Sequence, residues 1–203
     1  MVGMSLGLGL GLGSSNPPAQ PISPNGGPEL LLQAEIVFRG DKANEGFLVR
    51  AVSLPWLEIV DHLQRDPNFL FSFAKHPRKL EEFIAACYDR AGFDQVILTP
   101  QRGDGGTDVI AIKNGYGSIR FLDQVKAYSS GHRVTHNDVR AMLGSLTANP
   151  NSSKCIITTT SDFEPGIIKP GSDLAQFIPY RLELKNGPAI LDWIESIKKG
   201  ESG

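Results

Sequence analysis

The sequence predicts an α/β fold in which a mixed β-sheet is flanked by helices and carries a small appendage at its N-terminal end. Two observations lead to this prediction. From residue 76 onward, segments with the apolar period of a helix alternate with short apolar segments rich in β-branched residues. Their order is helix, three strands, helix, two strands and helix, and this alternation is typical of a sheet covered by helices.

The first helix of this order has the clearest pattern. Pro77 stands where the first turn of a helix tolerates proline, and Gly92 is expected to end the helix. Between them the apolar residues recur at the spacing of one core-facing stripe, namely Leu80, Phe83, Ile84, Cys87 and Ala91. We further expect strands at 95–99, 108–113 and 118–128, a helix at 135–146, strands at 154–160 and 181–185, and a last helix at 188–199.

The chain is predicted to divide into three parts. Residues 1–28 repeat glycine and leucine and then become rich in proline, so we expect a disordered tail. Residues 29–75 are expected to form a small α+β element that packs on the main domain, residues 76–203, because so short a segment buries little core alone. In this element the pattern predicts a strand over 30–38, a turn at Arg39-Gly40-Asp41 and a helix that opens at Leu54.

The composition excludes several classes of protein. The formal net charge is −2, so any affinity for nucleic acid must come from a local basic surface. The two cysteines, Cys87 and Cys155, are too few for a disulfide framework, and each lies in an apolar run. We expect two buried, reduced thiols in a cytoplasmic protein. The sequence has no apolar run long enough to cross a bilayer, so no membrane association is expected.

The strand expected at 118–128 carries an unusual pair of polar residues. Side chains two positions apart share one face of a strand, so Gln124 and Lys126 point the same way, together with Leu122 and Tyr128. Partial burial of an amide and a lysine is costly unless something binds them. A metal ion and a phosphate group would do so.

The turn before this strand fixes the expected register. If Asp108 lies opposite Gln124 in an antiparallel hairpin, Asn114 faces Ser118 and the loop is Gly115-Tyr116-Gly117. A three-residue loop with glycine in the left-handed position is a common hairpin connection. If the register slipped by one residue, Asp108 would lie opposite Asp123, and its carboxylate would be separated from the strand face that carries Lys126.

These residues suit hydrolysis of a phosphodiester bond. Asp108 offers the anionic oxygen that Mg²⁺ prefers, and Gln124 can add a neutral carbonyl oxygen. Lys126 can position the attacking water or offset the developing charge. Glu81, one turn into the first helix and off its apolar stripe, can reach the metal directly or through water. A purely structural ion pair between Asp108 and Lys126 is the alternative.

The same residues carry a family resemblance. The opening helix reads HPRKLEEFIAACYDRAGF, and DGGTD at 104–108, QVKAY at 124–128, ITTT at 157–160 and LELKNG at 182–187 follow it. This set resembles the Mrr-like branch of the PD-(D/E)xK restriction endonucleases over residues 76–199. The resemblance implies a restriction-endonuclease-like core and a catalytic domain at 76–203. It implies catalytic Asp108, Gln124 and Lys126, with Glu81 as a fourth member and with Asp108, Gln124 and Glu81 as metal ligands.

The chain departs from the family pattern in two places. Pro165, Gly166, Pro170 and Gly171 interrupt the region after the Thr-rich strand, so a loop with a short helix is expected there. Residues 29–75 are too few for the winged-helix DNA-reading domain that many members carry. Target selection is therefore expected to be minimal, structure-based or supplied by a partner.

Other polar residues have a weaker claim to function. A basic rim for DNA binding is predicted from Lys113, Arg120, His132 and Arg133, with a solvated surface as the alternative. His132 and His136 have a zinc-like spacing, but no partner ligand stands at a fitting distance in the sequence. Glu82 is expected to be solvated, and Asp104 to shape the turn at Gly105-Gly106.

Three functions follow from this pattern. The first is an endonuclease that cuts double-stranded DNA with Mg²⁺, or Mn²⁺ in its place, in defence against foreign DNA. The second is a repair or junction-resolving nuclease with the same site, and the third is a nucleic-acid-binding module that does not cleave. Cutting both strands with one active site per chain would call for a homodimer.

Overall fold

The computed structural model of the chain describes residues 28–101 and 106–201. The expected tail lies outside these residues except for Pro28, and so does Asp104. No helix in the described part of the chain is long and apolar enough to cross a membrane.

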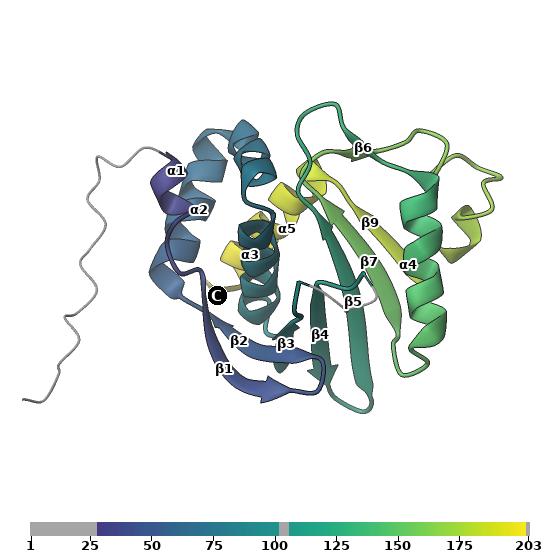
Figure 1. Cartoon of the computed structure of the whole chain (residues 1–203), viewed down its shortest axis with the longest axis horizontal. Helices are drawn as coiled ribbons and strands as arrows, with labels where there is room; N and C mark the ends of the chain where they lie inside the picture. Colours follow the sequence, from purple (N-terminus) through teal and green to yellow (C-terminus); the bar gives the residue numbers. More distant parts are fainter. Residues whose placement is uncertain (1–27, 102–105, 202–203) are drawn as a thin grey trace, which may run out of the picture.

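A seven-stranded mixed sheet forms the centre of the molecule, in the order β1-β2-β3-β4-β5-β7-β9 (Figure 1). The strands are β1 (Val37–Ala43), β2 (Gly46–Ala51), β3 (Gln95–Leu98), β4 (Val109–Asn114), β5 (Ser118–Lys126), β7 (Lys154–Thr159) and β9 (Leu182–Lys185). Strands β1 to β5 pair antiparallel with their neighbours, whereas β7 runs parallel to β5 and β9 runs parallel to β7. The short strands β6 (Arg133–Val134) and β8 (Asp162–Phe163) pair with each other outside this sheet.

Helices cover both faces of the sheet (Figure 1). On one face, α2 (Ser53–Arg65), α3 (Pro77–Arg90) and α5 (Gly187–Glu201) enclose a core that includes Trp56, Phe83 and Ile194. On the other face, α4 (His136–Ala148) buries Val139, Met142 and Leu146 against the sheet. The remaining helical segments are α1 (Pro28–Leu31), η1 (Pro67–Lys75) and η2 (Ala175–Phe177). The predicted fold class, a mixed sheet flanked by helices, is confirmed.

The elements of the main domain begin and end within two residues of their predicted limits, with few exceptions. The helix from Pro77 buries Leu80, Phe83, Ile84 and Cys87, and Gly92 follows it with a φ of 80°. Ala91, assigned to the same stripe, is exposed because the helix has ended at Arg90. The expected irregular stretch at 165–171 holds no helix, and η2 follows it.

The N-terminal element differs from its prediction. Residues 30–38 do not form one strand, because α1 and a turn occupy the segment up to residue 34 and β1 begins at Val37. Arg39-Gly40-Asp41 is not a turn but lies inside β1, where the register to β2 shifts between Arg39 and Lys42. A bulge of this kind accommodates the glycine without ending the strand. The chain reverses instead at Asn44 and Glu45, and β2 and η1 were not predicted.

Both cysteines are buried and free, as predicted. Burial raises the pKa of the Cys87 thiol to about 12, partly offset by a hydrogen bond from the Trp56 indole at 3.4 Å. Burial likewise raises the pKa of Cys155 to about 11. Both side chains therefore stay uncharged within the core.

Candidate active site

The β4–β5 hairpin has the register that its turn predicts. Asn114 pairs with Ser118 and Val109 with Asp123, and the amide of Gly115 bonds the carbonyl of Gly117 across the loop. Asp108 directly precedes β4, and its backbone N–H donates to the carbonyl oxygen of Asp123 at 2.9 Å. The paired residues begin at Val109, and the same register continued by one position leads to Asp108 opposite Gln124.

The Asp108 carboxylate is fixed against β5. Its Oδ2 atom accepts a hydrogen bond of 2.8 Å from the backbone N–H of Val125. This bond holds one oxygen of the carboxylate at the strand that carries Gln124 and Lys126. Asp108, Gln124 and Lys126 are all partly exposed.

Alternation along β5 separates the two faces as predicted. Leu122 and Tyr128 belong to the core beneath α4, whereas Phe121 and Val125 belong to the core beneath α3 and α5. Gln124 and Lys126 therefore lie on the α4 face of the sheet. The common face follows from the strand period alone.

The side-chain oxygen of Gln124 is buried at the candidate site. Among the residues that the structure describes, its Oε1 atom is buried and accepts no hydrogen bond. The amide nitrogen lies against Gly106, where an added Cβ would stand 2.9 Å from Nε2 and where φ is +82°. A buried acceptor without a donor is costly unless a cation completes it. This oxygen therefore fits a metal ligand.

Lys126 pairs with a carboxylate that the sequence analysis missed. Its Nζ atom lies 3.4 Å from Oδ1 of Asp138, near the start of α4. Asp138 also closes a capping box with Thr135, whose backbone N–H and hydroxyl donate to Asp138 Oδ2 at 2.9 and 2.7 Å. Burial alone would raise the pKa of Asp138, but these bonds and the charge of Lys126 outweigh it and lower the pKa.

Glu81 belongs to the opposite face of the sheet from Gln124 and Lys126. It lies on α3, and its side chain, 12% exposed, accepts a hydrogen bond from Arg78. Its neighbour Glu82 was expected to be solvated, but it is buried. Its carboxylate forms ion pairs with Lys79 at 2.8 Å and Arg39 at 3.4 Å. Arg39 comes from β1, so the prediction for Glu82 failed because its partner lies far away in the sequence.

The four residues predicted to bind DNA divide into two pairs. Lys113 and Arg120 lie at the turn end of the hairpin. There Lys113 forms an ion pair with Asp94, and Arg120 forms one with Glu45. His132 and Arg133 are exposed beyond the other end of β5, near Lys126. The ring of His132 packs against that of Tyr128 in a tilted arrangement, with centroids 4.0 Å apart. Only the second pair shares an end of the hairpin with the candidate site.

The remaining polar residues near the site have structural partners. His136 contacts Glu164 through Nδ1 at 2.8 Å. The hydroxyls of Thr159 and Thr160 donate to the backbone oxygens of Lys126 and Tyr128, and Thr158 donates to Asp123. Within residues 28–101 and 106–201, no three His, Cys, Asp or Glu side chains gather as a metal site. A metal at this hairpin would therefore depend on the amide of Gln124.

Asp123 is the second carboxylate that the sequence analysis passed over. It is 1% exposed and lies between Phe121 and Val125 on the opposite face of β5. Burial raises its pKa to about 6, although the charge of Lys185 and hydrogen bonds from Tyr88 and Thr158 partly offset the effect. A charged residue between two apolar ones on an inward face was the available signal.

The comparisons with known proteins define the class of the chain. A family model described as a restriction endonuclease, the Mrr catalytic domain, matches residues 74–194. The chain therefore belongs to this family, and its core is a restriction-endonuclease-type nuclease domain.

Two solved restriction endonucleases are similar in structure. The DNA modification-dependent restriction endonuclease AspBHI is 16% identical, with a TM-score of 0.48, over 67% of this chain and 40% of that one. Restriction endonuclease FokI is 15% identical, with a TM-score of 0.49, over 81% of this chain and 36% of that one. The chain thus spans less than half the length of either enzyme. No curated protein matches the sequence.

Proposed function

We propose that the chain is a metal-dependent endonuclease that hydrolyses phosphodiester bonds in double-stranded DNA. Asp108 and Gln124, together with Glu81, are the residues that would hold Mg²⁺, or Mn²⁺ in its place. Such an ion supplies Lewis acidity and positive charge at the phosphoryl group. The observation that carries the proposal is the buried Oε1 of Gln124, which has no hydrogen-bond partner among the described residues, on the strand whose Val125 N–H fixes the Asp108 carboxylate.

Each residue of the hairpin has a distinct task in this mechanism. The Val125 N–H orients the Asp108 carboxylate, so no rotamer has to be fixed when an ion arrives. Lys126 directs its ammonium group toward the reacting phosphate, where it orients the attacking water and offsets the developing negative charge. Asp138 holds that ammonium group in place before substrate binds.

Metal dependence is tested with the purified full chain and supercoiled plasmid DNA. Cleavage is expected with Mg²⁺ or Mn²⁺ and not with EDTA, and Asp108→Asn is expected to abolish it. Asp192→Asn, a matched loss of an exposed carboxylate on α5, should cut like the wild type. Cleavage that survives EDTA or Asp108→Asn would refute the proposed chemistry.

The biological role proposed is restriction of foreign DNA in the cytoplasm. Plasmid, methylated plasmid and branched DNA are compared as substrates, since a repair or junction-resolving nuclease would prefer the branched form. Binding to every substrate without cleavage would instead indicate a non-cleaving module. Cleavage of both strands in one encounter would call for a homodimer, which light scattering of the DNA complex can measure.

A further inference from the structure

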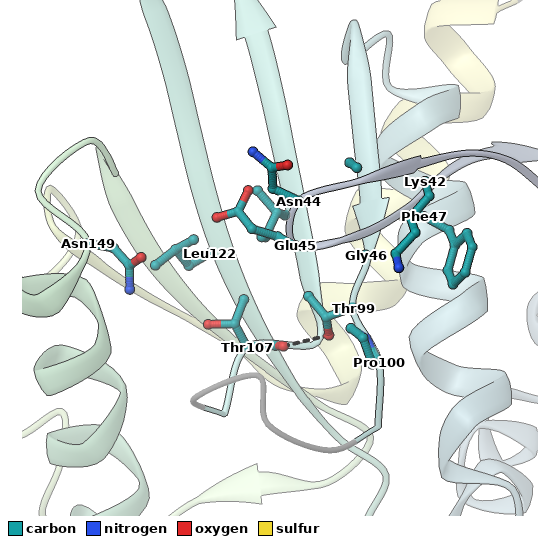
Figure 2. A pocket seen from close by; sticks show the side chains of 12 residues that line it. Lys42, Asn44, Glu45, Gly46, Phe47, Thr99, Pro100, Thr107, Leu122 and Asn149 are labelled. Atoms are coloured by element: carbon teal, nitrogen blue, oxygen red, sulfur yellow. Dashed lines mark hydrogen bonds between the residues drawn. The ribbon is translucent and has the colours of Figure 1, made fainter.

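A cavity of about 350 Å³ lies on the α4 face of the sheet. Figure 2 shows the side chains that line it. Asn44 and Glu45, at the turn between β1 and β2, form one side of it. Thr107, two residues before β4, and Leu122, on β5, form another part of the lining. Asn149, at the end of α4, closes another side. The cavity is of a size that holds small ligands.

The position of the cavity ties it to the proposed chemistry. Thr107 directly precedes Asp108, and Leu122 lies two positions before Gln124 on the same face of β5. Residues spaced in this way are about 7 Å apart along a strand. A nucleotide strand whose phosphate lies at Asp108 and Gln124 would therefore bring an adjacent nucleotide to the cavity.

The lining groups favour a neutral hydrogen-bonding partner over a phosphate. The cavity presents the amides of Asn44 and Asn149 and the carboxylate of Glu45, and Lys42 is the one cation among its described lining residues. Asparagine pairs with adenine through two hydrogen bonds, and a carboxylate accepts from the amino group of cytosine. Charge and donor chemistry together fit the edge of a nucleobase.

The wall that carries Asn44 is held firmly against the sheet. An added Cβ at Gly46 would stand 2.3 Å from the carbonyl oxygen of Leu98, so β2 can approach β3 this closely only with glycine there. On the opposite side of the turn, Arg120 bonds the Glu45 carboxylate. The family model begins at residue 74, so this wall lies outside the matched region.

We propose that this cavity binds a nucleobase next to the cleaved phosphate and that Asn44 reads its edge. The N-terminal hairpin would then determine specificity for the nuclease domain rather than only pack on it. The inference rests on the proposed function, because the nucleobase belongs to the DNA substrate.

The test uses the full chain with Asp108→Ala, which should bind DNA without cutting it. Selection from a randomised duplex library, followed by fluorescence anisotropy, measures base preference and affinity. Adding Asn44→Ala should remove the preference at one position and weaken binding of the selected duplex about tenfold. Adding Asn114→Ala, an exposed asparagine at the far end of the hairpin, should change neither.

The outcomes separate this inference from the proposed function. If every variant binds DNA with unchanged affinity and preference, or if the parent shows no base preference, the role of Asn44 is refuted while DNA binding stands. If no variant binds DNA, both proposals fail. Thermal melting checks folding, and Asn44→Asp, which keeps the shape but loses the amide donors, should change the preferred base rather than abolish DNA binding.

Discussion

The two faces of β5 place polar groups in opposite situations. On the α4 face, Gln124 and Lys126 are partly exposed beside Asp108. On the α3 face, Asp123 is enclosed and receives hydrogen bonds from Tyr88 at 2.8 Å and Thr158 at 2.9 Å. Among the described residues, Gln124 Oε1 and Asp123 Oδ1 both lack a hydrogen-bond partner.

The two oxygens differ in whether solvent ions can reach them, so their burial has different effects. An enclosed carboxylate can relieve its burial only by taking up a proton, which is why the pKa of Asp123 rises to about 6. A side chain in a partly open site can relieve it by binding an ion from solvent. Burial of an acid therefore does not by itself mark an active site in this fold.

The largest effect is expected from the open face. Lys126→Met keeps the aliphatic stem but removes the charge that would stabilise the transition state, so single-turnover cleavage should fall by about 10²–10³-fold. Lys199→Met, at an exposed position of α5, is the control. Melting temperatures should match the wild type within error, and a cleavage rate within a few-fold of wild type would remove Lys126 from the mechanism.

Substitutions on the enclosed face should change the stability of the protein rather than its cleavage activity. The folded state raises the pKa of Asp123, so its contribution to stability is present below about pH 4 and is lost as the pH rises through about 6. The side chain of Asp123→Asn stays neutral at every pH. The free energy of unfolding of this variant should therefore rise relative to the wild type across this range, by on the order of 2–3 kcal/mol at pH 7. Urea unfolding at pH 4 and pH 7 measures the difference, and equal values at both would contradict the assigned burial.

The contact between Lys126 and Asp138 can be separated from the helix cap. Both Asp138→Ala and Thr135→Ala break the capping box and should cost about 1 kcal/mol of stability. Only Asp138→Ala also removes the carboxylate at Lys126, so it alone should slow cleavage, by about tenfold. Equal cleavage rates in the two variants would assign Asp138 to the cap only.

The smallest effect concerns the hydroxyl that contacts Asp123. Tyr88→Phe removes a hydrogen bond that lowers the pKa of Asp123, so that pKa should rise further. The variant should lose about 1 kcal/mol, and more at pH 8 than at pH 4, because the bond is stronger to the charged carboxylate. A loss independent of pH would mean that the hydroxyl does not act on the charged form.

The sequence could predict features that depend on local spacing. The length of the Gly115–Gly117 loop predicted the register of the hairpin, although neither glycine has the positive φ that was expected. The strand period put Gln124 and Lys126 on one face. It could not pair Lys126 with Asp138 or Glu82 with Arg39, because helix placement and sheet order create these contacts. The sequence Arg39-Gly40-Asp41 likewise resembled a turn, although it forms a bulge within strand β1.

Titration of Mn²⁺ into the full chain by calorimetry tests the central claim most directly, because it reports metal binding without cleavage. We predict one site, lost in Asp108→Asn, weakened in Gln124→Ala and strengthened in Gln124→Glu, where a charged oxygen replaces the neutral one. Gln33→Ala, an exposed glutamine near the N-terminal end, should not change binding. Equal Mn²⁺ affinity in all these variants would contradict a metal site built on Asp108 and Gln124.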